Sequence, residues 1–174
     1  MINKLVSAVI VAAFSITAVA AQTSAVANPQ IPFPAQFFTG GLNYNSQTSP
    51  EVTGYVAYAP VINQSSGLYS YTAVDVTSVT KHPFRVQTQI STGAAKWIGT
   101  FSGFDWFALG AAGAAFNTNA ANTATNIGAA LSTGVFATKP LGKKGVFLTL
   151  TGKMLYSSTG GIQGPFGIGL GWGK

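Results

Sequence analysis

The last nine residues, apart from the final lysine, alternate bulky apolar side chains with glycine. The apolar members are Phe166, Ile168, Leu170 and Trp172. Because successive side chains of an extended strand point to opposite faces, this segment predicts a strand with one apolar face and one almost bare face. A soluble strand normally buries its large apolar residues and exposes polar ones. The pattern here therefore favours a wall between lipid and a crowded interior.

The same period of two runs through most of the chain, and clusters of Gly, Pro, Asn and Ser mark the turns. It predicts eight extended segments, at residues 36–45, 52–62, 68–79, 84–99, 104–117, 125–138, 145–157 and 164–173. Most are close to the roughly 9 to 11 residues that a tilted strand needs to cross a bilayer. Since a sheet in lipid cannot leave an open edge, we expect an all-β, antiparallel, up-and-down transmembrane barrel of eight strands.

The faces are clearest in segment 145–157, where Leu148 and Leu150 share one side and Thr149 and Lys153 the other. The tyrosines of the second and third segments fit either face: Tyr55, Tyr58, Tyr69 and Tyr71. A barrel of eight strands is just wide enough to be filled by its own side chains. We therefore expect a plugged interior, or at most a narrow pore.

The composition supports strands rather than helices as the spanning elements. Charged residues make up 7% of the chain, against about 25% in typical soluble domains. The longest run of small apolar residues outside the N-terminus, 108–116, is far shorter than the ~20 residues of a helical span. The chain has no cysteine, so it has neither disulfides nor thiolate metal sites.

The first residues predict export. Lys4 precedes an apolar stretch, and small residues at 19–21 suit a signal peptidase. We expect a signal peptide at 1–21, an extended lead-in at 22–35 and the barrel domain at 36–174. A later cleavage after residues 25–27 and an uncleaved membrane anchor are the alternatives.

The alternation, the even strand count and the aromatic near the C-terminus resemble the small eight-stranded outer-membrane barrels of Gram-negative bacteria, typified by the OmpA transmembrane domain and OmpX. This resemblance implies a location in the bacterial outer membrane, with outer-membrane lipids and the barrel-assembly machinery as partners. It also implies that the last strand is a C-terminal assembly signal, read at Phe166, Ile168, Leu170 and Trp172. Here Gly173 and Lys174 follow the aromatic, and the short connections depart from the long adhesive loops of the family.

Aromatic residues near several predicted strand ends suggest a girdle at the membrane interface, where amphipathic rings prefer to lie. The girdle candidates are Trp97, Phe104, Trp106 and Trp172. The alternative is that they are core aromatics of a soluble barrel.

Two charged residues lie symmetrically about Thr80. A tight hairpin centred there would place Asp75 opposite Arg85 on the inner face. Because a buried charge needs a partner, we expect an ion pair that plugs the lumen. A gating role or simple surface exposure are the alternatives. Lys153 has no evident partner in the sequence, although Glu51 is a candidate.

The sequence offers little for catalysis, metal or cofactor binding. His82 is the only histidine and lies in a turn, and the chain has three acidic residues. A hydrolase needs a nucleophile, a base and usually an orienting acid in mutual reach, so we expect no enzyme activity, no metal and no cofactor. The net charge is +6, but the basic residues are scattered, which disfavours nucleic acid as a partner.

These patterns favour a structural or general envelope role without a defined reaction. A secreted soluble β-barrel that binds a small apolar ligand is the main alternative, and it needs the inverse assignment of faces. A surface structural or adhesive subunit is a third. We expect the polar stretch 117–126 to be an external loop, and the oligomeric state is left open.

Overall fold

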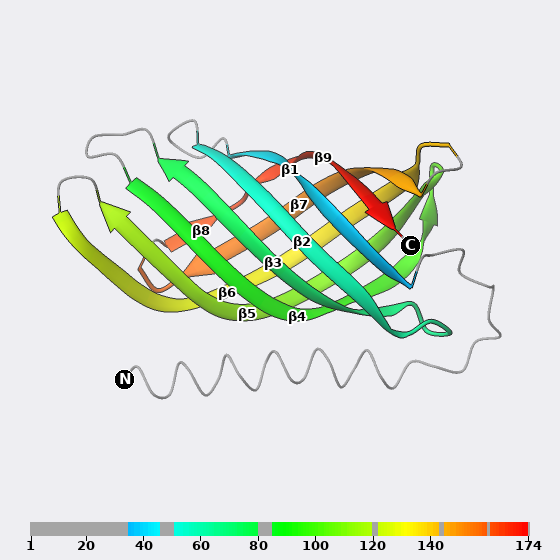
Figure 1. Ribbon diagram of the computed structural model, residues 1–174, viewed down its shortest axis with the longest axis horizontal. Coiled ribbons are helices and arrows are strands. Elements are labelled where there is room, and N and C mark those ends of the chain that lie inside the picture. The colour runs from blue at the N-terminus through cyan, green and yellow to red at the C-terminus, as the bar shows by residue number, and fades with distance from the viewer. Residues whose placement is uncertain are drawn as a thin grey trace.

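The computed structural model describes residues 35–45, 51–79, 85–119, 122–142, 145–159 and 161–173. The expected signal peptide and residues 22–34 of the lead-in lie outside this part of the chain. The strands, tilted around one long axis in Figure 1, are β1 (Gln36–Asn45), β2 (Glu51–Asn63), β3 (Leu68–Val79), β4 (Arg85–Phe101), β5 (Phe104–Asn119), β6 (Asn122–Pro140), β7 (Val146–Ser157), β8 (Gly161–Gln163) and β9 (Phe166–Gly173). Within the described segments no helix is long and apolar enough to cross a bilayer.

The sheet closes on itself. Each strand from β1 to β7 pairs with the next in antiparallel fashion, β7 pairs with β9, and β9 pairs with β1 from Phe37–Gly173 to Tyr44–Phe166. With β8 and β9 counted as one interrupted strand, this is an eight-stranded antiparallel barrel. The fold class expected from the alternation is confirmed.

The last predicted strand is interrupted. β8 and β9 both pair with β7, and Gly164 and Pro165 separate them. Proline has no backbone N–H for a ladder, so a break at this point is expected. Its carbonyl still accepts a hydrogen bond of 2.9 Å from the Lys153 amide, which keeps the interruption attached to β7.

The expectation that residues 117–126 form an external loop is wrong. β5 continues to Asn119 and β6 begins at Asn122, with Asn117 opposite Asn126 and Thr118 opposite Thr125. The Asn and Thr content indicated a loop, but a polar hairpin satisfies its backbone groups by cross-strand pairing just as well. These strands therefore extend beyond their expected ends.

The two ends of the barrel differ. The turns at 64–67 and 102–103 lie at the end where β9 terminates, β6 ends and β7 begins, here called the turn end (Figure 1). Ser102 and Gly103 both have positive φ, 54° and 74°, as a two-residue type I′ hairpin requires. Strands β1, β3, β5 and β7 end at the opposite end of the barrel.

Candidate functional site

The outer face of the wall is apolar, and the inner face holds the buried polar side chains together with a cluster of aromatic and small apolar residues. Ile168 and Leu170 are 55% and 59% exposed, whereas Thr149 and Gln89 are 0% and 1% exposed. Large aliphatic residues are exposed around the barrel: Leu42, Val52, Val56, Ile62, Val74, Val76, Ile90, Ile98, Ile127, Val135, Met154, Ile168 and Leu170. Water-soluble proteins rarely expose apolar surface so continuously. The arrangement is that of a wall whose outer solvent is hydrocarbon, as the alternation predicts.

The bare face of β9 lets side chains from its two neighbours meet above it. Asn43 of β1 and Thr151 of β7 both pair with Gly167, and the Thr151 hydroxyl donates to Asn43 Oδ1 at 2.6 Å. Thr39 and Thr149 likewise bond at 3.0 Å. A Cβ added at Gly167 would lie 2.5 Å from Asn43 Oδ1. These glycines thus make room for hydrogen bonds between strands that are not adjacent.

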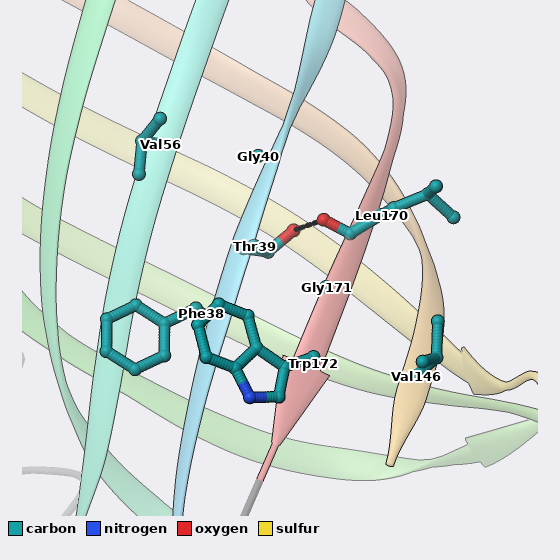
Figure 2. A pocket seen from close by; sticks show the side chains of 8 residues that line it. All are labelled: Phe38, Thr39, Gly40, Val56, Val146, Leu170, Gly171 and Trp172. Atoms are coloured by element: carbon teal, nitrogen blue, oxygen red, sulfur yellow. Dashed lines mark hydrogen bonds between the residues drawn. The ribbon is translucent and has the colours of Figure 1, made fainter. Parts of the chain in front are cut away.

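β9 lies between β1 and β7 where the barrel closes, and we call this part of the wall the seam. A groove runs along its outer surface (Figure 2). It has a volume of about 390 Å³ and is lined by Phe38, Thr39, Gly40, Val56, Val146, Leu170, Gly171 and Trp172. No lining residue is charged, and the Phe38 and Trp172 rings stack at 4.8 Å between centroids. Such a groove suits hydrocarbon.

Three of the four girdle candidates lie on the outer face at the turn end. Trp172 stacks on Phe38, and Phe38 stacks on Tyr58 at 4.4 Å, which gives a row of three rings. The Trp106 indole N–H donates a hydrogen bond to the Phe101 carbonyl at 3.4 Å. Lys139 Nζ lies 5.4 Å from the Phe104 ring centroid. These amphipathic contacts are typical of an interfacial belt.

Trp97 is a correction, because it faces inward. It pairs with Phe107, which is fully buried, so both side chains share the inner face, and Trp97 packs against the interior cluster. The register shifts immediately afterwards between Trp97 and Gly99, leaving Ile98 as the exposed residue. A β-bulge of this kind changes which residue of a strand points outward.

A second group of outward aromatics lies at the opposite end, and the sequence analysis did not assign it to the girdle. Tyr44 and Phe166 contact each other edge to face at 6.3 Å, and both are about half exposed. The signal was present, because Tyr44 lies two residues after Leu42 on the same face of β1. The structure thus brings aromatic rings to both ends of the outer wall.

The interior at the turn end is filled by aromatic rings. The Phe37 ring contacts those of Tyr69, Phe107 and Phe136, and all four residues are buried. The Phe107 ring also contacts Tyr69 and stacks on Phe136 at 4.6 Å. Tyr71 stacks on Phe136 at 6.2 Å. We call this set, Phe37, Tyr69, Tyr71, Phe107 and Phe136, the aromatic plug. Its residues come from four different strands, β1, β3, β5 and β6, so it spans the lumen.

Asp75 forms an interior ion pair with Lys153, whereas the sequence predicted Arg85 as its partner. Lys153 Nζ lies 2.7 Å from Asp75 Oδ1, and both side chains are 1% exposed. The β3–β4 register pairs Asp75 with Gln89 and Arg85 with Val79, so the hairpin is centred at residue 82 and not at residue 80. The Arg85 and Glu51 side chains lie outside the described structure.

The ion pair is enclosed by rings and amides. Lys153 Nζ lies 4.5 Å from the Tyr55 ring centroid and 5.9 Å from that of Tyr71. Nearby buried polar atoms without a protein partner in the described structure include Asp75 Oδ2, Gln89 Oε1 and Ser91 Oγ. Buried polar atoms are normally satisfied, so this half of the interior is suited to ordered water.

The fold and its inverted faces define a transmembrane-type β-barrel. The chain is similar to Neisserial surface protein A, NspA, with a TM-score of 0.59 and 12% identity over 80% of this chain and 95% of that protein. De novo designed transmembrane β-barrels also match, with TM-scores of 0.46 and 0.41, identities of 12% and 14%, and coverage of 83% of this chain and 98% and 97% of theirs. No protein-family model and no curated protein matches the sequence. The likeness to NspA concerns the fold.

Proposed function

We propose that this chain is an exported barrel of the bacterial outer membrane with a structural or general envelope role. The outer wall carries the proposal: exposed aliphatic residues surround a barrel whose buried polar side chains face inward, and aromatic rings flank the apolar band. Burying that outer surface in lipid removes the cost of leaving it in water. The similarity of the fold to that of NspA supports this proposal.

The turn end faces the periplasm in this proposal, as short turns do in outer-membrane barrels. The partners would be outer-membrane lipids and the barrel-assembly machinery, which would read the outward row Phe166, Ile168, Leu170 and Trp172 of β9. This row lies at the seam where the barrel closes on β1. The last strand to pair is therefore also the one that carries the assembly signal.

No reaction and no wide channel are part of the proposal. The aromatic plug crosses the lumen at the turn end, and the Asp75–Lys153 pair lies in the polar part of the lumen. An interior filled in this way fits an eight-stranded barrel that serves as a membrane-anchored scaffold.

The secreted alternative needs large apolar residues in a central cavity and polar residues outside. Leu170 and Ile168 lie outside, and Gln87, Gln89 and Thr149 lie inside, which is the opposite arrangement. A ligand site of the calycin kind would have to form in a lumen that the aromatic plug and buried polar side chains already occupy. The observations therefore favour the membrane over a soluble carrier.

Fractionation and heat-modifiable migration test the proposal together. We expect the protein in the outer-membrane fraction, extractable only with detergent, and a shift in gel migration that appears only after boiling, because a closed barrel resists cold detergent. Leu170→Arg should lower the fraction that folds, since a charge on the lipid face costs about 2 to 4 kcal/mol near the midplane. Recovery of the protein from the periplasm or medium without detergent would contradict the proposal.

A further inference from the structure

A second groove on the outer wall lies towards the turn end, over β3 to β6. It has a volume of about 210 Å³ and is lined by Leu68, Ala94, Lys96, Ala108, Leu109, Gly110, Thr133 and Gly134. The small residues Ala94, Ala108 and Gly110 form the floor of this groove. Ala94 of β4 pairs with Gly110 of β5, and Ala108 of β5 pairs with Lys96 of β4. The Thr133 hydroxyl donates to the Leu109 carbonyl at 3.2 Å, so it is not left unpaired in the groove.

This groove differs from the seam groove of Figure 2 in having a cation at its rim. Lys96 is half-buried, and its Nζ donates to the Ser66 carbonyl in the turn at 64–67, at 2.5 Å. The stem therefore lies along the apolar wall while the ammonium reaches the end of the barrel, as a lysine at a membrane interface does.

The charge of Lys96 is not neutralised within the described structure, where the ion pair found joins Asp75 and Lys153. An ammonium group carries three donors, and the Ser66 carbonyl takes one. Two donors are left for an acidic group at the level of the lipid headgroups.

We propose that this groove binds one anionic glycerophospholipid. An acyl chain lies on the floor formed by Ala94, Ala108 and Gly110, and the headgroup phosphate accepts hydrogen bonds from Lys96. The inference rests on the proposed membrane location, because only a lipid-embedded wall presents the groove to acyl chains. The cation at one end and the apolar floor beside it match the two parts of such a lipid.

Native mass spectrometry of the purified full-length protein, released from detergent with equal amounts of phosphatidylglycerol and phosphatidylcholine of the same chain length, tests the site. We expect one retained phosphatidylglycerol per barrel, in preference to phosphatidylcholine. Lys96→Gln should lower phosphatidylglycerol retention about fivefold, the equivalent of about 1 kcal/mol for one interfacial lysine. Lys139→Gln removes the same charge at the same end but outside the groove, and should leave retention unchanged.

A second pair of variants tests the acyl-chain floor. Ala108→Leu fills the groove and should reduce retention of both lipids, whereas Ala112→Leu, further along β5 and not part of the lining, should not. Equal retention by the wild type, Lys96→Gln and Ala108→Leu would overturn the inference. So would a dimer that Ala108→Leu abolishes, since the occupant would then be a second copy.

The same preparations separate this failure from failure of the proposed function. Heat-modifiable migration is recorded for each variant before the measurement. A barrel that is heat-modifiable but retains lipid regardless of Lys96 overturns the lipid site alone. A protein that needs no detergent for solubility overturns both.

Discussion

At the scale of single residues, the Asp75–Lys153 pair shows how tightly the interior is specified. Each group is almost fully buried and is the other's charged partner, with two tyrosine rings around the ammonium. Desolvating both charges is expensive, so the pair is weak evidence for a net gain in stability. Removing one member, however, leaves an uncompensated charge in the lumen.

We expect Asp75→Asn or Lys153→Met alone to destabilise the folded barrel by about 3 to 5 kcal/mol, and the double variant to recover most of that loss. Urea unfolding in detergent micelles measures both effects. Arg85→Ala is the matched control, because Arg85 lies opposite Val79, and a change of no more than about 0.5 kcal/mol is expected there. If Arg85→Ala lowered the stability of the barrel and Asp75→Asn did not, the result would favour the Asp75–Arg85 pair, which the register argues against.

At the scale of elements, β9 shows how glycine shapes the lumen. A Cβ at Gly169 would lie 2.4 Å from the Gly40 carbonyl oxygen and 2.6 Å from Tyr55 Oη. The neighbouring strand and a buried ring thus occupy the space that any side chain at this position would need. The bare face is a packing requirement of the closed barrel.

Gly169→Ala should destabilise the barrel by about 1 to 3 kcal/mol, because it overpacks a filled interior. Gly152→Ala in β7 is the control, since a Cβ there meets only Val135 Cγ2 at 4.0 Å, an ordinary contact. Melting temperatures in the same detergent compare the two. If Gly152→Ala proved the more harmful, the assignment of the inner face of β9 would be wrong.

The alternation predicted both faces of β7 and β9, because a period of two depends only on neighbouring positions. It did not predict the partner of Asp75, since contacts across the lumen depend on how the whole sheet closes and staggers. Trp97 was misplaced because the bulge beside it leaves no clear mark in the sequence. Asn117, Thr118, Thr125 and Asn126 were expected in a loop because composition alone does not reveal that polar residues pair across two strands.

At the scale of the whole molecule, the interior is divided along the barrel axis. The aromatic plug lies at the turn end, and the Asp75–Lys153 pair lies further along the axis among buried Asn, Gln and Thr side chains. We expect the rings of the plug to block the passage of water and ions through the lumen.

We expect no steady conductance from the wild-type protein in planar bilayers. Phe107→Ala combined with Phe136→Ala removes the ring pair stacked at 4.6 Å and should introduce small, measurable currents. Phe166→Ala, which removes an outward ring, controls for general loosening of the barrel. Stable conductance by the unmodified protein would contradict the plugged interior.

The pairing of β9 with both β1 and β7 makes this one strand a condition for closure of the sheet. Without β9, Phe166–Gly173, the facing edges of β1 and β7 would present unpaired N–H and C=O groups, which hydrocarbon does not tolerate. A variant truncated before Phe166 is therefore expected to lack a closed form that a bilayer can accommodate.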